Sequence, residues 1–251
     1  MEHKVGRLET LVSSLGPLPA GCMPTIKTSF SVVCADFKDL GQTIRRLDEA
    51  GCDLFHFDVV DGHFARTITV GPMVVASLRN ATSVPMETHL ATWEPDLFLE
   101  GVAASGSDIV TANIEACPNA VRFVRRAKEL GMRAGFALNP ATPLSSVELL
   151  LDQLDVVLLL TVDAGFAGQP FTPGVVPKIR KLRQMAWERR LRLDIEVDGH
   201  INQETIPAVV RAGANILVLG TSCGILDNLE QAAGLLRAIR SQAEAAVEFQ
   251  E

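Results

Sequence analysis

The chain alternates short apolar runs with longer stretches of helical period, and this alternation constrains the fold more than any other feature. The strand-like runs occupy residues 27–34, 53–58, 85–90, 108–113, 132–138, 155–162, 192–198 and 215–220. Helical patterns between them include residues 38–50, 118–130 and 173–190. Such regular alternation is typical of βα units that build a parallel sheet.

Several strand-like runs follow a glycine that indicates the end of a helix. The phrases 50-AGCD-53, 104-ASGSD-108 and 212-AGAN-215 each place Gly just after a helical stretch, which is a C-cap signal. Eight such units without a linker predict an α/β fold, a single (β/α)8 TIM barrel over residues 25–251 that follows an N-terminal extension at 1–24. The alternative is a doubly wound open sheet, but its usual Gly-rich turn after the first strand is missing here.

Charge and cysteine usage narrow the class of protein. The net charge is −7 and the pI is about 5.3, which argues against a nucleic-acid surface. The 5 cysteines have no CxxC spacing, so they indicate reduced thiols and neither a disulfide framework nor a zinc ribbon. No apolar run reaches the roughly 18 residues of a membrane span, and the first residues lack an apolar signal core. We therefore expect a cytoplasmic protein without a membrane partner.

Polar side chains gather where several predicted strands end, which is where barrels of this type carry their active sites. They are Ser31, His56, Asp58, His89 and Asp198. A lone strand histidine is more often a core residue, and a lone strand-end aspartate is more often a helix cap. Two His and two Asp at strand ends together favour a borderline divalent ion such as Zn, Fe, Mn or Co. Glu196 shares a face with Asp198 one layer deeper, so we expect it to support the ligands from below.

Three loops after the last strands have the glycine and hydroxyl content of an anion site. They are 163-DAGFAGQPF-171, 199-GH-200 and 220-GTSCG-224. Any one of them alone is ordinary turn chemistry, but loops after strands 7 and 8 are a recurrent phosphate site in this architecture. A metal beside a phosphate predicts a short phosphorylated metabolite, whose carbonyl the metal polarises and whose α-proton a carboxylate removes.

Six phrases of the sequence resemble one known family. They are 56-HFDVVDGHF-64, 88-THL-90, 138-LNPATP-143, 162-VDAGFAGQPF-171, 196-EVDGHIN-202 and 220-GTS-222. Together they resemble the ribulose-phosphate 3-epimerases and the closely related D-allulose-6-phosphate 3-epimerases, over roughly residues 26 to 240. The resemblance implies a barrel of the ribulose-phosphate-binding type.

The resemblance also implies a role for each site residue. One divalent metal ion would be held by His56, Asp58, His89 and Asp198. Asp58 and Asp198 would be the acid/base pair, one taking the C3 proton of the ketose and the other returning a proton on the opposite face through an enediolate. Contacts with substrate and phosphate would fall on Ser31, His89, Gly165, Phe166, Ala167, Gly168, Gly199, His200, Gly220 and Thr221. The family is commonly dimeric or hexameric, so a homo-oligomer is expected.

The sequence departs from the family pattern around the substrate. Val60, Ala91 and Leu160 stand where the family usually has methionine, and Asn113 replaces a usual histidine. The default reaction is D-ribulose 5-phosphate to D-xylulose 5-phosphate, and the alternatives are D-allulose 6-phosphate or another ketose phosphate. A non-catalytic sugar-phosphate-binding paralogue is a further alternative, although the two retained aspartates argue against it. A lyase of the same superfamily would mostly need a lysine near the second or third strand end, and none stands there.

Overall fold

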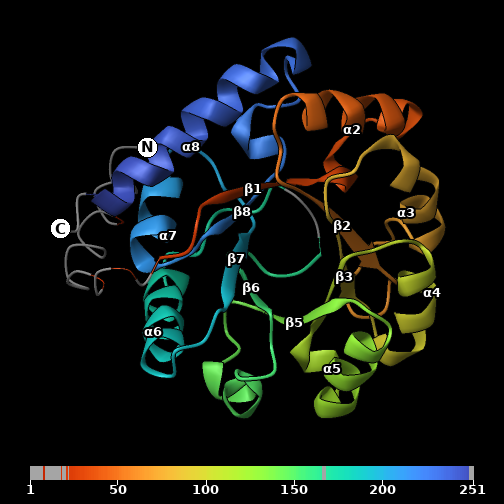
Figure 1. Cartoon of the computed structure of the whole chain (residues 1–251), viewed down its shortest axis with the longest axis vertical. Coiled ribbons are helices and arrows are strands. Elements are labelled where there is room, and N and C mark those ends of the chain that lie inside the picture. The colour runs from red at the N-terminus through yellow and green to blue at the C-terminus, as the bar shows by residue number, and fades with distance from the viewer. Residues whose placement is uncertain (1–7, 9–17, 19–20, 22, 166–167, 249–251) are drawn as a thin grey trace.

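The protein is a closed barrel of parallel strands surrounded by helices, as its computed structural model shows (Figure 1). The structure describes residues 8, 18, 21, 23–165 and 168–248. The strands follow one another around the ring in sequence order, and the first pairs with the last to close it. This arrangement confirms the predicted TIM barrel and excludes the open sheet.

Each predicted strand is present. The strands are β1 (Lys27–Ser31), β2 (Leu54–Val60), β3 (Met86–Ala91), β4 (Ile109–Asn113), β5 (Arg133–Leu138), β6 (Val156–Leu160), β7 (Asp194–Asp198) and β8 (Ile216–Leu219). The first is shorter than the predicted run 27–34, because Val32–Cys34 turn into a 3-10 helix, η1. Their side chains are almost continuously buried, since the barrel covers one face of each strand and the helices cover the other.

The helices lie outside the barrel (Figure 1). They are α2 (Leu40–Glu49), α3 (Pro72–Leu78), α4 (Leu99–Ala104), α5 (Ala120–Glu129), α6 (Val175–Glu188), α7 (Ile206–Ala212) and α8 (Ala232–Glu248). The predicted glycine caps are confirmed, because Gly51, Gly106 and Gly213 have φ values of 89°, 83° and 119°. The connection from β5 to β6 departs from the pattern: it consists of two 3-10 turns, η6 (Leu144–Ser146) and η7 (Glu148–Leu150).

Side chains alternate along each strand between the helix layer and the barrel interior. Phe55 and Phe57 of β2 belong to the main apolar cluster, which also contains Ile44 and Leu47 of α2. The other face of β2 carries Leu54, His56 and Asp58 into the barrel. Leu54 forms a separate apolar cluster with Ile109 and Val156, which is the floor of the interior. The polar residues of the site lie above this floor.

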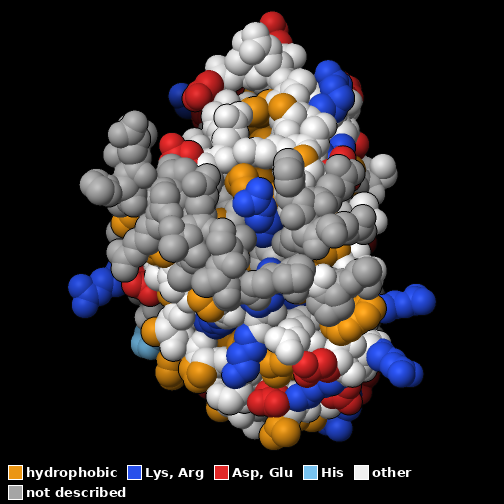
Figure 2. Space-filling view, turned by 90° about the vertical axis from the view of Figure 1, so that its left-hand side faces the viewer, with side chains coloured by type: hydrophobic (Ala, Val, Ile, Leu, Met, Phe, Trp, Pro, Cys, Tyr) orange, Lys and Arg blue, Asp and Glu red, His pale blue; other side chains and the backbone are white. Residues whose placement is uncertain are grey.

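Charged residues close the bottom of the barrel, where the strands begin. Asp194 accepts hydrogen bonds from Lys27 Nζ at 3.0 Å and from an Arg133 nitrogen at 2.7 Å. Arg183, 2% exposed, donates to Asn215 Oδ1 at 2.8 Å and to two backbone carbonyls. On the face shown in Figure 2, Lys and Arg side chains are interspersed with acidic and apolar ones.

The predicted extension at 1–24 lies largely outside the described residues, although Leu8 is buried and belongs to the main apolar cluster. Within the described residues, no helix is long and apolar enough to cross a membrane. The division into an extension and a barrel stays a prediction.

Candidate active site and metal centre

A cavity of about 460 Å³ opens at the carboxyl ends of the strands. The predicted site residues that line it are Ser31, Asp58, His89, Gly165, Gly168, Asp198, Gly199, His200, Gly220 and Thr221. His56 is fully buried and lies beneath the lining. Phe166 and Ala167 lie outside the described residues. Residues that are far apart in the sequence therefore meet at one mouth, as the barrel topology requires.

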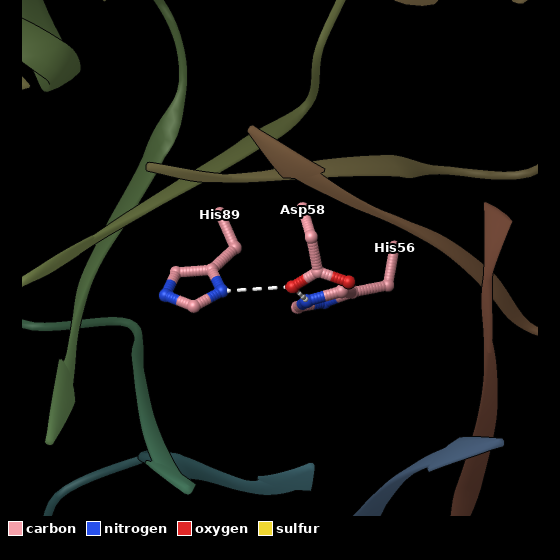
Figure 3. A group of neighbouring side chains, drawn as sticks. All are labelled: His56, Asp58 and His89. Carbon is pink, nitrogen blue, oxygen red and sulfur yellow. Dashed lines mark hydrogen bonds and ion pairs between the residues drawn. The ribbon is translucent and has the colours of Figure 1, made fainter. Parts of the chain in front are cut away.

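Two histidines converge on one carboxylate oxygen at the base of this cavity (Figure 3). His56 Nε2 lies 3.1 Å from Asp58 Oδ1, and His89 Nδ1 lies 3.0 Å from the same oxygen. Ser31 Oγ donates to the other carboxylate oxygen of Asp58 at 3.0 Å. The ligand atoms of His56, Asp58 and His89 lie within 4.8 Å of one another. Asp198, the fourth predicted ligand, lines the same cavity but is not part of this group.

Two buried glutamates lie below His56. Its Nδ1 atom is 3.4 Å from Glu196 Oε1 and 3.5 Å from Glu87 Oε2, and all three side chains are fully buried. Thr111 Oγ1 donates to the other oxygen of Glu87 at 2.8 Å. Glu196 therefore lies beside His56, and the supporting role expected for it stays a prediction. Glu87 was missed in the sequence, although its position two residues before His89 on one strand face was a usable signal.

The second nitrogen of His89 also has a partner. Nε2 lies 3.0 Å from Asn113 Oδ1, at the end of β4. Asn113 Nδ2 in turn donates to Glu115 Oε2 at 3.2 Å. Both imidazoles are therefore held on the side away from Asp58, which fixes their ring orientation. Neither Asn113 nor Glu115 was assigned to the site from the sequence, and neither of them lines the cavity.

The two aspartates of the cavity have opposite pKa shifts. Burial raises the pKa of Asp58, but the contacts with His56 and His89 outweigh it and hold that pKa well below its ordinary value. Burial and the nearby charge of Asp58 raise the pKa of Asp198 to about 6. Two carboxyl groups in one cavity with pKa values pushed apart are the pattern of an acid/base pair.

The donor set fits a divalent cation. Two imidazole nitrogens and a carboxylate oxygen already face one another, and His/Asp ligands suit Zn, Fe, Mn or Co. The described residues that line the cavity include no Lys or Arg to balance Asp58 and Asp198. A cation bound among His56, Asp58 and His89 would offset the negative charge of the cavity's aspartates.

The loops on the β6–β8 side of the cavity have unusual backbone conformations. Gly199 has a φ of 111°, and a Cβ atom there would lie 2.6 Å from Val162 Cγ2. His200 adopts a φ of 55° although it is not glycine, which is a strained conformation that often accompanies function. Thr161 Oγ1 donates to the carbonyl of Asp198 at 2.9 Å and so ties β6 to this turn. With no cationic side chain in the described lining, an anion there would rely on backbone N–H groups and hydroxyls.

An apolar wall completes the cavity. Val60, Ala91 and Leu160, the positions at which the family usually has methionine, are buried and all contribute to the lining. Cys34, which follows β1, also lines the cavity and was not expected there. Burial raises the pKa of its thiol.

The closed barrel with a histidine–carboxylate cluster at its mouth defines a (β/α)8 protein of the TIM-barrel class. Solved structures share this fold at low identity. A mutant form of the tryptophan synthase alpha-subunit from Pyrococcus furiosus matches with a TM-score of 0.58 at 16% identity, over 89% of this chain and 98% of that one. Tryptophan synthase subunit alpha from Legionella pneumophila matches with a TM-score of 0.55 at 13% identity, over 96% of this chain and 98% of that one. These likenesses show the fold alone.

Sequence comparisons identify the family. The model of the Ribulose-phosphate 3 epimerase family matches residues 27–223. The ribulose-phosphate 3-epimerase of Bacillus subtilis is 45% identical over 78% of this chain and 91% of its own length. Those of Synechocystis and Escherichia coli K12 are 42% and 39% identical, over 80% and 76% of this chain and 89% and 86% of theirs. The chain belongs to the ribulose-phosphate 3-epimerase family, which confirms the resemblance of its motifs.

Proposed function

We propose that the protein is a metal-dependent ketose-phosphate 3-epimerase that interconverts D-ribulose 5-phosphate and D-xylulose 5-phosphate. The observation that carries this proposal is the pair of carboxyl groups, Asp58 and Asp198, that line one cavity with opposite pKa shifts. The names of the relatives support ribulose 5-phosphate over D-allulose 6-phosphate as the substrate. The retained pair also argues against a non-catalytic binding protein.

Inversion at C3 without a redox cofactor needs two proton-transfer groups on opposite sides of a planar enediolate. Asp58 is on β2 and Asp198 on β7, and β1 and β8 separate these strands in the ring. Ser31 holds one oxygen of Asp58 in place. One of the two aspartates takes the C3 proton and the other, on the opposite side, returns a proton. Which of them acts first depends on the direction of the reaction.

A divalent ion bound by His56, Asp58, His89 and Asp198 would polarise the ketose carbonyl and acidify the C3 proton. The two imidazoles would bind such an ion in their neutral form, and their buried contacts with Glu87, Glu196 and Asn113 keep the rings directed at the cavity. Exclusion of water by the apolar wall would strengthen these electrostatic contacts.

The phosphate group is proposed to bind on the opposite side of the mouth, against the loops after β6, β7 and β8. Gly165 and Gly168 of the first loop, Gly199 and His200 of the second, and Gly220 and Thr221 of the third line this side of the cavity. Phe166 and Ala167 are included in the proposal from the family motif. Backbone amides, the Thr221 hydroxyl and the His200 ring are the available donors.

The test measures solvent deuterium exchange at C3 for a panel of ketose phosphates that includes D-ribulose 5-phosphate and D-allulose 6-phosphate. Asp58→Asn and Asp198→Asn should each abolish conversion of one epimer into the other, whereas the exposed Asp152→Asn should leave conversion and exchange unchanged. Binding of a ketose phosphate by the metal-loaded protein without any exchange would instead indicate a binding protein. Epimerisation at the original rate in either site variant would exclude the two-aspartate mechanism.

The cytoplasmic location and the homo-oligomer, a dimer or a hexamer, stay predictions. Size-exclusion chromatography with light scattering checks the oligomer directly.

A further inference from the structure

The imidazole of His89 is held between two acceptor groups. Nδ1 lies 3.0 Å from Asp58 Oδ1, and Nε2 lies 3.0 Å from Asn113 Oδ1. His89 is 2% exposed and Asn113 is fully buried, so water does not compete for the contact between these two side chains. A neutral histidine that ligates a metal through Nδ1 must carry its proton on Nε2. The atom of Asn113 that faces Nε2 therefore matters for the metal centre.

The orientation of the Asn113 amide is set by Glu115. Asn113 Nδ2 donates to Glu115 Oε2 at 3.2 Å. The other oxygen of Glu115 accepts from the Asn139 backbone N–H at 2.9 Å and from the Thr142 hydroxyl. Glu115 is exposed at the surface, and partial desolvation of its carboxyl raises its pKa, but these donors outweigh that effect and keep the pKa below its ordinary value. An ionised carboxylate only accepts hydrogen bonds, so the NH2 group of Asn113 must face Glu115 and its oxygen must face His89.

We propose that Glu115 and Asn113 form a positioning pair that selects the Nε2–H tautomer of His89 and so leaves Nδ1 free to bind the metal. The pair acts through His89 and does not itself line the cavity. This inference rests on the proposed metal centre, and it adds a residue, Glu115, that acts on that centre across two hydrogen bonds.

The orientation of the Asn113 amide can be reversed by a substitution at Glu115 that replaces one side-chain oxygen by nitrogen. In Glu115→Gln the side-chain oxygen remains with the Asn139 backbone N–H, because an N–H group cannot face an NH2 group. The new NH2 then meets the NH2 of Asn113, and the Asn113 amide turns over to avoid the clash. Its nitrogen then donates to His89 Nε2, which favours the Nδ1–H tautomer that cannot ligate. We expect metal affinity to fall about 10- to 100-fold, the range for lost support of a ligating histidine.

A second substitution should restore the metal site. An aspartate at position 113 accepts hydrogen bonds through both oxygens, so it can receive the Nε2–H of His89 and the NH2 of a glutamine at 115 at the same time. The double variant Asn113→Asp with Glu115→Gln should therefore regain most of the metal affinity lost in Glu115→Gln alone. Recovery by a second change is a coupling that independent structural damage does not produce.

The experiment measures zinc affinity by competition with a chelating dye, and records the imidazole ¹H–¹⁵N spectra that distinguish the two histidine tautomers. Asn80→Ala, at an exposed position of η3 (Arg79–Ala81), is the matched control and should bind zinc as the unmodified protein does. The proposal is supported if Glu115→Gln weakens zinc binding, shifts His89 to the Nδ1–H form, and is rescued by Asn113→Asp. Unchanged affinity with His89 still in the Nε2–H form, or a loss without rescue, overturns it.

Neither readout requires turnover, so this test is separate from that of the epimerase. If the unmodified protein binds no metal, the proposed metal centre fails. A change in the His89 tautomer between the metal-free unmodified protein and Glu115→Gln still decides whether the pair acts on it, because Asp58 contacts Nδ1 in both proteins. Should Glu115→Gln fail to fold, Asn113→Leu decides alone, because it removes the acceptor for Nε2–H. Loss of the Nε2–H form in that variant supports the proposal, and its retention overturns it.

Discussion

Replacing Gly199 by alanine should both destabilise the barrel and disturb the site. Gly199 follows Asp198 directly and has a φ of 111°, which L-residues with a side chain rarely adopt. A Cβ atom there would lie 2.6 Å from Val162 Cγ2 and 3.0 Å from Thr161 Oγ1. The first distance is well below van der Waals contact, and the backbone that precedes Gly199 is held by the β6–β7 pairing up to Asp198. The new methyl group therefore has little room to relax.

Two contributions set the size of the effect. The unfavourable backbone conformation costs about 1–3 kcal/mol. The overlap with Val162 and Thr161 costs about 1–3 kcal/mol more, as extra methyl groups in a packed region usually do. The sum is roughly 2–6 kcal/mol, and a central value of about 4 kcal/mol lowers the Tm of a chain of this size by about 8–16 °C. Activity should fall as well, because a shift of about 1 Å in Asp198 can cost about 100-fold.

Thermal unfolding followed by circular dichroism measures the first effect, and C3 exchange at a temperature well below both transitions measures the second. Gly234→Ala is the matched control, because Gly234 lies in α8 and a Cβ atom there would have nothing within 4 Å. That variant should be stabilised by up to about 1 kcal/mol, since alanine favours the helix over glycine. A Gly199→Ala protein with the Tm and exchange rate of the original would refute the reasoning.

Three further outcomes are expected. Arg183→Met should lower stability by about 3–5 kcal/mol, because it leaves the buried carbonyls of Gly213 and Leu193 without this donor. It also removes one of the two donors to Asn215 Oδ1, which keeps only the Ile195 N–H. A loss below about 1 kcal/mol in urea unfolding contradicts this. Burial raises the pKa of Asp194, but Arg133 and Lys27 outweigh it and hold that pKa below its ordinary value. The ionised Asp194 side chain therefore stabilises the fold above its unfolded-state pKa of about 3.9, and this stabilisation is lost as the pH falls through its folded-state pKa. Between pH 5 and pH 3, the Tm of Asp194→Asn should therefore decrease less than the Tm of the unmodified protein. Treatment with a chelator should stop C3 exchange and lower the Tm, and Zn, Mn, Co or Fe(II) should restore both; exchange that survives full metal removal contradicts the metal mechanism.

The sequence was sufficient to predict the barrel because the apolar runs, the helical stretches and the glycine caps all indicated the same fold. Each strand is a short apolar run, and the caps at Gly51, Gly106 and Gly213 separate three of these runs from the helices before them. Once the strand order is that of a closed barrel, polar residues at the strand ends must converge. For this reason Asp58 and His89 could be placed at one mouth from the sequence alone.

Contacts that depend on side-chain length and rotamer could not be predicted in the same way. Glu87 reaches His56 from the neighbouring strand, and Thr111 reaches Glu87, through torsions that no periodicity reports. Asn113 was visible in the sequence only as a departure from the family pattern, yet its amide contacts His89. Asp198 was predicted as a ligand, and the structure leaves it outside the three-residue group. The alternation along a strand predicts whether a residue faces the barrel interior or the helices, but it does not determine interatomic distances.

The interior of the barrel explains why these polar groups can be retained together. Above the apolar floor, Glu87, Glu196 and His56 are fully buried, and isolated buried charges would be costly. Burial raises the pKa of Glu87, but His56 outweighs it and lowers that pKa to about 2, whereas burial and the charge of Glu87 raise the pKa of Glu196. The two glutamates lie against Nδ1 of His56 and leave its Nε2 directed at Asp58. A carboxylate beside one ring nitrogen makes the other nitrogen a better ligand for a cation, so the buried layer supports the chemistry proposed for the mouth.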